Sequence, residues 1–454
     1  MKINSQRAIG AMLGSAIGDA LGAPFEFGPE GRFTRLFPQP WLGVETEMIG
    51  GGGCGWSAGE FTDDTQMAVI LGESLLDHDA LNGAEVFKRF QSWAKTASDV
   101  GNQTRAVLHD RDWENSARLH FERNGQSAGN GSLMRATTSA VFAAGETLDQ
   151  SFDLALAQSA LTHGDPAAGW GAAIYHGMIH AALRGASVIE ILPLLLDRLP
   201  SPHGDRYRAM LLSDVALADE PRNGSVWTCL AQAVRIVRST SSFEEAMRRA
   251  CDVGDDVDTV ACVTGGLAGA IYGVQSIPSR WTTQVHGTVE GQTRRNADLQ
   301  ELALRLIGQP APGIAGDIVQ RGPIEIRPSV WAANILGALA TTDDTAVLSL
   351  CRVGDRFQDR QYRREFFLID QEDANPGLAF VVGDAVAEID AFLDEGIDVV
   401  VHCHAGESRT ALVLRAWLMQ HEELTVEEAN QELESMWPFV KHHNGDFERL
   451  LENL

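Results

Sequence analysis

The chain has 454 residues, of which 44% are hydrophobic and 22% are charged, so it can build folded cores and is unlike disordered or collagen-like sequences. Typical domains have roughly 100–200 residues, so this length implies more than one domain. The formal net charge of −26 argues against nucleic acid as a partner, because proteins that bind phosphate backbones usually carry a basic domain or stripe.

Cysteine usage and hydropathy indicate the cellular setting. The six cysteines form no CxxC pairs, which disfavours a disulfide framework and a zinc ribbon. The apolar run near the N-terminus resembles a signal peptide, but Asp19 and Glu26 interrupt the pattern. No stretch has the roughly 18 uncharged apolar residues that a membrane span requires. We therefore expect a soluble, cytoplasmic protein that does not bind membranes.

The first two thirds of the chain show helical periodicity almost throughout, with few strand signals. The predicted helices lie near residues 5–22, 64–77, 83–95, 149–162, 166–184, 226–238, 243–253 and 257–274. This pattern predicts an all-α domain over residues 1–308.

Two of these predicted helices carry glycines at a spacing of four residues. The first stripe is Gly10, Gly14, Gly18 and Gly22, and the second is Gly265, Gly269 and Gly273. A glycine inside a helix costs about 1 kcal/mol relative to alanine, so a closely approaching neighbour must require these residues. Each stripe could accept a different bulky neighbour, or the two stripes could meet, and the sequence leaves both arrangements open.

Composition changes after residue 308, where glycine and proline become frequent and predict a linker over residues 309–322. Beyond the linker, short β-type runs at 347–351, 366–369 and 399–402 alternate with helical stretches at 379–395 and 410–421. This alternation predicts a small α/β domain with a mostly parallel sheet over residues 323–454.

Clustered carboxylates are the most unusual local feature of the helical region. Residues 62–65 read Thr-Asp-Asp-Thr and residues 256–259 read Asp-Val-Asp-Thr, each before an apolar helix. Acids gathered at one place repel one another unless cations neutralise them, and such oxygen ligands suit Mg2+ or Mn2+. Threonine and aspartate are also ordinary residues at helix starts, and Thr-Asp-Asp-Thr recurs at residues 342–345 before a predicted strand. The motif alone leaves metal binding and helix capping open.

Five motifs together resemble the ADP-ribosylglycohydrolase family in content and order. They are GDALG with PFE at residues 18–26, TDDT at 62–65, GNGSLMR at 129–135, TH at 162–163 and DVDT at 256–259. The resemblance covers about residues 5–306. It implies an all-helical fold, two divalent cations, Mg2+ or Mn2+, in an acidic cleft, and release of ADP-ribose from a modified target, with arginine as the default acceptor.

The resemblance also implies roles for individual residues. One cation would be bound by Thr62, Asp63, Asp64 and Asp258, and the other by Asp256, Asp258 and Thr259, with Glu26 as a ligand or gate. Asp63 or Asp64 would act as the general base toward an attacking water. Ribose or diphosphate would be bound by Gly129, Asn130, Gly131 and Ser132, and His163 would pack on the ligand. Without the resemblance, residues 129–132 fit an ordinary turn before a helix, and His163 fits a buried structural histidine.

A cysteine and an arginine flank a predicted loop between a strand and a helix near residue 403. The loop motif runs His402-Cys403-His404-Ala405-Gly406-Glu407-Ser408-Arg409-Thr410. Such a loop directs its N–H groups at one point beside a helix N-terminus, so it binds phosphate and favours a thiolate. Cys403 is then the nucleophile, Arg409 binds two phosphate oxygens and Thr410 hydrogen-bonds the sulfur.

This motif resembles the HCxxGxxR signature of cysteine-dependent tyrosine and dual-specificity phosphatases, over roughly residues 320–454. The resemblance implies an aspartic general acid on an upstream loop. Asp370 and Asp373 both fit, and Asp373 is preferred for its Asp-Ala-Asn-Pro-Gly setting. Glu407 would have to turn toward solvent, because inside the loop it would repel phosphate.

The two halves together predict a bifunctional hydrolase. Its substrates would be an ADP-ribosylated protein, or a small ADP-ribosyl conjugate, and a phosphorylated substrate. Two alternatives remain open: a module that binds ADP-ribose or phosphate without cleavage, and a hydrolase of free ADP-ribosyl compounds.

Overall fold

The computed structural model describes residues 2–125, 127–213, 217, 222–310 and 318–454. The chain divides into two compact units. Unit 1 comprises residues 1–39, 48–277 and 284–311, and unit 2 comprises residues 40–47, 278–283 and 312–454. Within the predicted linker, residues 311–317 lie outside the described residues.

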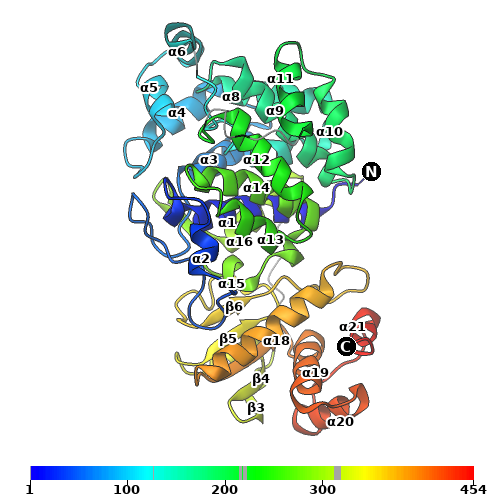
Figure 1. Ribbon diagram of the computed structural model, residues 1–454. Helices are drawn as coiled ribbons and strands as arrows, with labels where there is room; N and C mark the ends of the chain where they lie inside the picture. Colours follow the sequence, from blue (N-terminus) through cyan, green and yellow to red (C-terminus); the bar gives the residue numbers. More distant parts are fainter. Residues whose placement is uncertain (1, 126, 214–216, 218–221, 311–317) are drawn as a thin grey trace. The chain divides into compact units, whose positions relative to one another are not determined.

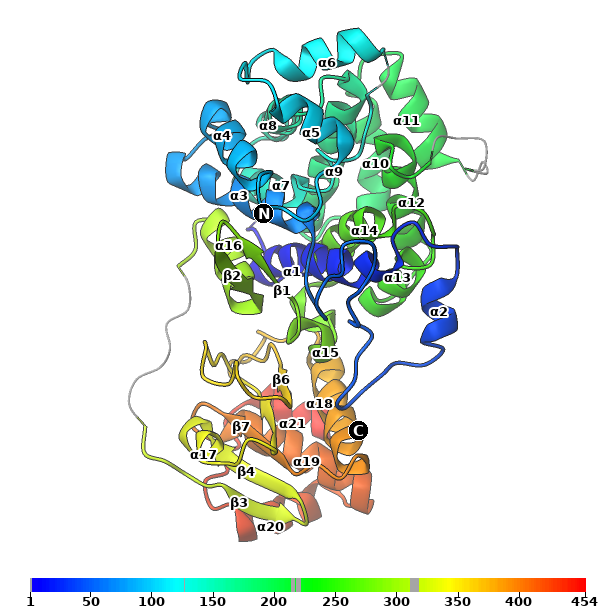
Figure 2. The same cartoon turned by 90° about the vertical axis from the view of Figure 1, so that its left-hand side faces the viewer.

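Unit 1 is built of helices, as the periodicity predicted (Figures 1 and 2). Its α-helices are α1 (Ser5–Gly22), α2 (Arg32–Leu36), α3 (Asp63–His78), α4 (Gly83–Trp93), α5 (Asn102–Leu108), α6 (Ser116–Asn124), α7 (Ala136–Phe142), α8 (Leu148–Ala160), α9 (Pro166–Ala182), α10 (Val188–Leu196), α11 (His203–Leu212), α12 (Val226–Arg238), α13 (Phe243–Ala250), α14 (Val257–Tyr272) and α16 (Asn296–Leu306). Short 3-10 turns are η1 (Ala23–Phe25), η2 (Ala143–Gly145) and η4 (Val274–Ser276). A hairpin of β1 (His286–Val289) and β2 (Gln292–Arg295) is an antiparallel addition that the sequence did not indicate.

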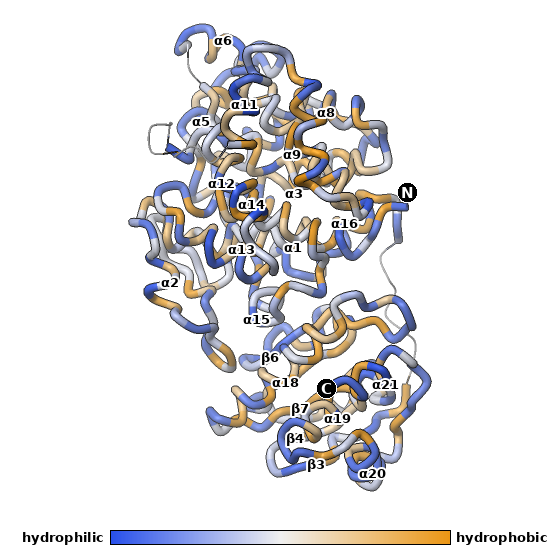
Figure 3. The backbone as a smooth tube through the Cα atoms, turned by 45° about the vertical axis from the view of Figure 1, so that its right-hand side comes forward, coloured by the Kyte–Doolittle hydropathy of each residue, from blue (hydrophilic) through white to orange (hydrophobic). Residues whose placement is uncertain are grey.

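The core of unit 1 contains helices that are buried on nearly all sides. Helix α1 is buried from Ala8 to Gly22. With η1 it is long and apolar enough to cross a membrane by length and composition, and that apolar window is entirely buried within the protein. Figure 3 shows how hydropathy differs between helices of this unit, with hydrophobic residues along α9 and hydrophilic residues along α6.

The two glycine stripes meet, which settles the alternatives left open above. A Cβ atom on Gly10 would lie 2.3 Å from the carbonyl oxygen of Gly269, and one on Gly14 would lie 2.3 Å from that of Gly265. A Cβ on Gly22 would lie 2.4 Å from the Cα of Asp258. Helices α1 and α14 therefore pack backbone to backbone in antiparallel directions, and this contact brings the end of α1 against the start of α14.

Unit 2 contains a five-stranded sheet in the order β3-β4-β7-β5-β6, which confirms the predicted α/β class. Its strands are β3 (Ile324–Arg327), β4 (Val330–Asn334), β5 (Ala346–Ser349), β6 (Arg363–Glu365) and β7 (Val399–Cys403). Only the β3–β4 pair is antiparallel, and β7 lies at the centre between β4 and β5. Helices α17 (Ile335–Leu339), α18 (Leu378–Asp394), α19 (Ser408–Glu422), α20 (Val426–Met436) and α21 (Gly445–Leu451) complete the fold.

One predicted strand is wrong. Residues 366–369 do not form a strand, and β6 ends at Glu365. The Phe366 N–H still donates to the Ser349 carbonyl at 3.0 Å, but side chains bind the backbone further on. Arg409 donates to the Leu368 carbonyl at 3.2 Å, and the Asn375 amide binds both the N–H and the carbonyl of Ile369. These contacts replace the ladder hydrogen bonds that a strand would need.

Unit 2 includes two short segments from the earlier part of the chain, residues 40–47 and 278–283, the latter containing α15 (Ser279–Thr282). Glu47, which is fully buried, pairs with Arg280 at 2.9 Å and accepts a hydrogen bond from Trp281 Nε1 at 2.9 Å. Glu388 on α18, also fully buried, pairs with Arg364 at 3.0 Å and accepts from the Gly43 backbone at 3.1 Å. The two segments thus contribute to the buried polar core of unit 2.

Candidate active sites

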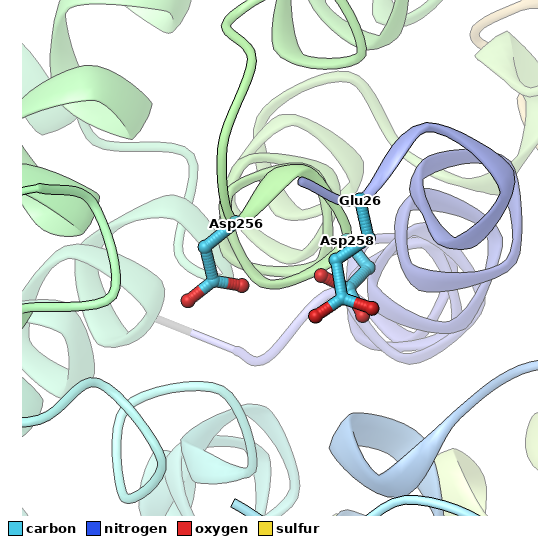
Figure 4. Close-up of side chains that lie close together, drawn as sticks. All are labelled: Glu26, Asp256 and Asp258. Carbon is cyan, nitrogen blue, oxygen red and sulfur yellow. The ribbon is translucent and has the colours of Figure 1, made fainter. Parts of the chain in front are cut away.

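Three carboxylates from two segments of unit 1 form a compact cluster (Figure 4). Glu26 follows η1, Asp256 precedes α14, and Asp258 lies in the first turn of α14. One oxygen from each lies within 4.8 Å of the others. The meeting of α1 with α14 explains the convergence, because Gly22 packs on Asp258 and Glu26 follows four residues later.

The start of α3 adds two further acids that are connected to this cluster. Asp63 and Asp64 occupy the first turn of α3 and are 8% and 1% exposed. Thr259 Oγ1 donates to Asp64 Oδ1 at 3.4 Å, which joins α14 to α3. The structure therefore brings together the residues expected to bind cations: Glu26, Thr62, Asp63, Asp64, Asp256, Asp258 and Thr259.

Two oxygens in this cluster are left without partners. Asp64 Oδ2 and Asp258 Oδ1 are buried and have no hydrogen bond within the described part of the chain. Buried polar atoms normally have a partner, and an unpaired buried carboxylate is costly. Carboxylate and hydroxyl oxygens are the ligands that hard divalent cations prefer, so the residues present fit Mg2+ or Mn2+.

The acids strongly disfavour one another's charges. Burial, followed by the charges of nearby acids, raises the pKa of Asp63, Asp64 and Asp258 well above the usual range. The same two causes raise the pKa of Glu26 to about 7. Asp99, which no sequence signal singled out, is one of the acids that raise the pKa values of Glu26 and Asp63. Without cations, burial and mutual repulsion therefore favour the protonated forms of these acids.

Capping accounts for only part of the motif. The Thr62 side chain caps α3 by accepting from the Asp64 N–H, whereas the Asp256 side chain makes no capping bond at the start of α14. Asp19 instead holds the start of α3, since its carboxylate accepts from the backbone of Thr62 at 3.0 Å and from Thr65 Oγ1 at 2.6 Å. Asp19 lies inside the GDALG motif, so the sequence marked it as a candidate residue, but no sequence pattern indicated that it holds the start of α3.

Asn130 contacts the acid cluster directly. Its Nδ2 donates to Asp256 Oδ2 at 2.8 Å and to the Asn223 carbonyl at 3.0 Å. Asn223 Oδ1 in turn accepts from the Asp256 N–H at 3.0 Å. Asn130 therefore orients the Asp256 carboxylate in this structure. Asn223 helps to hold Asp256 as well, although it lies in no recognisable motif and is only 3% exposed.

The other residues expected around the ligand lie near one another, but their side chains are placed differently. A Cβ on Gly129 or Gly131 would lie 3.2 Å from His163 Nε2, so both glycines make room for the imidazole ring. Ser132 is fully buried, and its hydroxyl accepts from Ser159 Oγ at 2.7 Å. The structure thus places Gly129, Gly131 and His163 together, and turns the Ser132 hydroxyl into the protein interior.

The phosphate-loop motif of unit 2 lies between the central strand and α19. Cys403 is the last residue of β7 and is 2% exposed, and Ser408 begins the fifteen-residue helix α19. Gly406 has φ +70°, and a Cβ there would lie 2.9 Å from Trp437, whose Nε1 donates to the Gly406 carbonyl at 2.6 Å. The loop His404-Ala405-Gly406-Glu407 therefore turns tightly beside a helix N-terminus, which suits an anion.

Arg409 and Thr410 lie at the start of α19. Arg409 Nη1 donates to the carbonyls of Leu350 and Leu368, both at 3.2 Å, while its Nε is buried without a hydrogen bond among the described residues. Thr410 is fully buried and its hydroxyl is also without such a partner. The arginine is thus held by two backbone carbonyls, and both side chains retain hydrogen-bonding capacity.

The two candidate general acids are placed differently. Asp370 Oδ2 lies 3.9 Å from Arg409 Nε, and its other oxygen lies 3.4 Å from His443 Nε2. Asp373 is exposed, with φ +58°, and its N–H donates to Asp446 at 2.6 Å. The geometry therefore favours Asp370 over Asp373, the residue preferred from sequence, because Asp373 is fixed in an exposed turn against α21.

Glu407 forms ion pairs with two basic side chains outside the loop. Its carboxylate pairs with Arg321 at 2.7 Å and with Lys441 at 2.6 Å. Arg321 also donates to the Ala405 carbonyl at 3.1 Å, so it ties the loop to the residues before β3. The negative charge of Glu407 is thereby neutralised beside the anion-binding loop.

Family models match both parts of the chain. Residues 2–313 match the model described as ADP-ribosylglycohydrolase. Residues 345–451 match the model described as the catalytic domain of dual specificity phosphatases.

Curated relatives and a solved structure support the larger match. The chain is 31% identical over 297 residues to the ADP-ribosyl-[dinitrogen reductase] glycohydrolase of Rhodospirillum rubrum, covering 64% of this chain and 94% of that protein. It is 31% identical over 294 residues to the ADP-ribosylarginine hydrolase Tri1 of Pseudomonas putida strain GB-1, covering 62% of this chain and 74% of that protein. The solved ADP-ribosylglycohydrolase-related protein complex matches with a TM-score of 0.54 at 30% identity, covering 68% of this chain and 99% of that chain.

Proposed function

Since this chain belongs to the ADP-ribosylglycohydrolase family and carries a dual specificity phosphatase domain, we propose that unit 1 releases ADP-ribose from modified arginine with two divalent cations, Mg2+ or Mn2+. Two of its relatives are named for an ADP-ribosylated protein and for ADP-ribosylarginine, which supports this acceptor. The observation that carries the proposal is the pair of buried, unpartnered oxygens on Asp64 and Asp258 within one acid cluster.

The residues of the cluster divide the work. Bound cations would orient the ribose hydroxyls and make a water more acidic. Asp63 is the better general base, because it accepts no hydrogen bond from the described residues, whereas Asp64 Oδ1 is bound by Thr259. Asp63 would take a proton from the attacking water as the bond from the anomeric carbon to the acceptor nitrogen breaks. Asn130 and Asp19 would keep Asp256 and the start of α3 in place.

A turnover assay on the full chain tests this proposal. The substrate is a protein carrying ADP-ribosylarginine, and free ADP-ribose is measured with and without EDTA. We expect release in Mg2+ or Mn2+, and none after chelation. Binding of ADP-ribose without any release under either condition would instead support a binding module and would exclude the proposed reaction.

For unit 2 we propose hydrolysis of a phosphate monoester through Cys403. The sulfur attacks phosphorus, forming an S–P bond as the P–O bond breaks, and Asp370 gives its proton to the leaving oxygen. Water then attacks the phosphorus and gives a proton back to Asp370 as the S–P bond breaks, which releases phosphate and restores the Cys403 thiolate. Arg409 and the backbone N–H groups of residues 404–408 bind the phosphate oxygens, and the Thr410 hydroxyl hydrogen-bonds the departing sulfur.

The phosphatase proposal is tested with a small aryl phosphate. We expect the full chain to hydrolyse it in EDTA, and Cys403→Ser to have no measurable turnover, because the serine hydroxyl is a far weaker nucleophile. Unchanged hydrolysis by Cys403→Ser would eliminate the thiol as nucleophile. The same variant should release ADP-ribose at the rate of the unaltered protein.

A further inference from the structure

Arg135 is a fully buried arginine without an acidic partner in the part of the chain that the structure describes. Its guanidinium donates to the side chain of Gln158 at 3.0 Å, to the Gln158 carbonyl at 2.7 Å and to Thr162 Oγ1 at 2.8 Å. A buried cation that has only neutral partners is expensive to desolvate. The carbonyl at the end of α8 explains one of these bonds, but not the bond to Thr162.

The bond to Thr162 determines the direction of the next hydrogen bond. A guanidinium can only donate, so Thr162 Oγ1 accepts from it. The hydroxyl hydrogen then remains, and His163 Nδ1 lies 2.9 Å from Oγ1 as its one acceptor among the described residues. If Nδ1 carried the proton instead, the hydroxyl hydrogen of fully buried Thr162 would have no acceptor. The ring hydrogen of His163 must therefore be on Nε2.

His163 is also held in its neutral form. The residue is 4% exposed, and burial, followed by the charges of Arg135 and His120, lowers its pKa to about 3. Nε2 has no hydrogen-bond partner among the described residues, and it lies 3.2 Å from where a Cβ atom on Gly129 or on Gly131 would be. Between these glycines lies Asn130, which binds Asp256 of the acid cluster. An N–H donor without a partner among the described residues is therefore available beside the proposed catalytic centre.

We propose that Arg135 and Thr162 are positioning residues that hold His163 as a single neutral tautomer, with its Nε2–H presented to an oxygen atom of the ADP-ribosyl group. The inference rests on the proposed function of unit 1. An imidazole free to exchange its proton would present a donor in one tautomer and an acceptor in the other. A donor fixed before the substrate arrives needs no reorganisation when it binds.

The tautomer can be observed directly, without a variant that alters the fold. The full chain is labelled with 15N in histidine, and the His163 signals are identified by their loss in His163→Gln. We expect an unprotonated Nδ1 and a protonated Nε2 in the absence of any substrate. A protonated Nδ1, or a mixture of both forms, would overturn the inference. This measurement is independent of turnover, so it stands or fails separately from the proposed reaction.

A matched pair of variants tests the consequence for substrate. Thr162→Val keeps the shape but removes the hydroxyl, and Thr162→Ser keeps the hydroxyl. We expect Thr162→Val to give a mixture of His163 tautomers and to lower kcat/KM for ADP-ribose release about tenfold, as for one lost hydrogen bond, while Thr162→Ser stays near the original value in both. Thr162→Val that retains the Nε2–H tautomer would overturn the inference, whatever its activity.

Discussion

The same tetrapeptide, Thr-Asp-Asp-Thr, occurs twice in this protein, in two different structural environments. At residues 62–65 it starts α3, where Asp63 and Asp64 are 8% and 1% exposed. At residues 342–345 it forms a turn before β5, where the Asp343 side chain is fully exposed and lies 3.6 Å from Arg360. Identical residues are therefore a candidate metal site in unit 1 and an ordinary surface turn in unit 2.

The difference lies in what surrounds each copy. A hydrogen bond from Thr342 lowers the pKa of exposed Asp344, whereas burial and neighbouring acids raise the pKa of Asp64. The end of α1 and the start of α14 converge on the first copy through Asp19 and Thr259, and the loop around Asn130 binds the neighbouring Asp256. The chemistry of a short motif is thus set by burial and by distant residues, and the following predictions test this conclusion.

The largest effect should come from removing the same acid from each copy. We expect Asp64→Ala to lower ADP-ribose release about 1000-fold, equivalent to roughly 4 kcal/mol of transition-state stabilisation. Asp344→Ala should leave it within about twofold, as for surface changes generally. Rates are measured at saturating Mg2+ with both proteins folded. Equal losses in the two variants would mean that the copies do not differ as described.

The close packing that buries the first copy should be sensitive to one methyl group. A Cβ on Gly18 would lie 2.0 Å from the Ala261 carbonyl oxygen, so we expect Gly18→Ala to reduce the free energy of unfolding by about 3 kcal/mol. The matched control is Gly383→Ala in α18, where a Cβ would meet nothing within 4 Å. That variant should gain about 1 kcal/mol from helix propensity. Chemical denaturation measures both, and a stable Gly18→Ala would contradict the backbone contact.

A second pair of aspartates, Asp370 and Asp373 in unit 2, also differs in burial and in partners. We expect Asp370→Asn to lower hydrolysis of an alkyl phosphate about 100-fold through loss of the general acid. Asp373→Asn should change the rate by less than about twofold, since surface changes away from a site have small effects. The assay uses a substrate with a poor leaving group, because such substrates depend most on protonation. The reverse order of effects would restore Asp373 as the acid.

The smallest effect concerns the pH dependence of stability without cations. The pKa of Glu26 is raised to about 7 and that of Asp19 to about 6, both mainly by burial. A carboxyl group whose pKa is raised in the folded protein stabilises the folded state while it is protonated. This contribution to the free energy of unfolding is complete below about pH 4 and is lost as the pH rises through 6 to 7. In EDTA we therefore expect the free energy of unfolding to be about 2 kcal/mol lower at pH 8 than at pH 5.

Cations and the exposed copy supply the controls for this pH effect. Excess Mg2+ should reverse the loss at pH 8, because cations compensate the ionised acids. Asp344→Asn should leave the slope between pH 5 and pH 8 unchanged, since the lowered pKa of Asp344 acts only at lower pH. A slope that is insensitive to Mg2+ would show that its origin lies outside the acid cluster.

Much of the architecture followed from local patterns. The helical region, the parallel-rich sheet and the phosphate loop at Cys403 are signalled by periodicity and by a contiguous motif. Local patterns failed where side chains replace ladder hydrogen bonds, as Arg409 and Asn375 do after β6. The β1–β2 hairpin was also missed, because its strands are only four residues long.

The candidate sites were predictable to the extent that their residues carry motifs. The acids at 62–65 and 256–259 have such motifs, but their meeting depends on the contact between α1 and α14, which no local pattern encodes. Asn223 lies in no motif, and it acts only because its amide meets the Asp256 N–H. The geometric preference for Asp370 over Asp373 rests on a turn geometry that their spacing to Cys403 does not reveal.

The composition of unit 2 bears on how such a protein could arise and be dissected. Two of its buried acids, Glu47 and Glu388, are bound by residues of segments 40–47 and 278–283. A fragment that started at residue 323 would lack both segments, and Glu388 and Arg364 would lose their hydrogen bonds to the Gly43 backbone. Residues 323–454 alone therefore lack part of the buried polar core of unit 2. Gene shuffling that moved unit 2 elsewhere would have to carry three separate stretches of coding sequence.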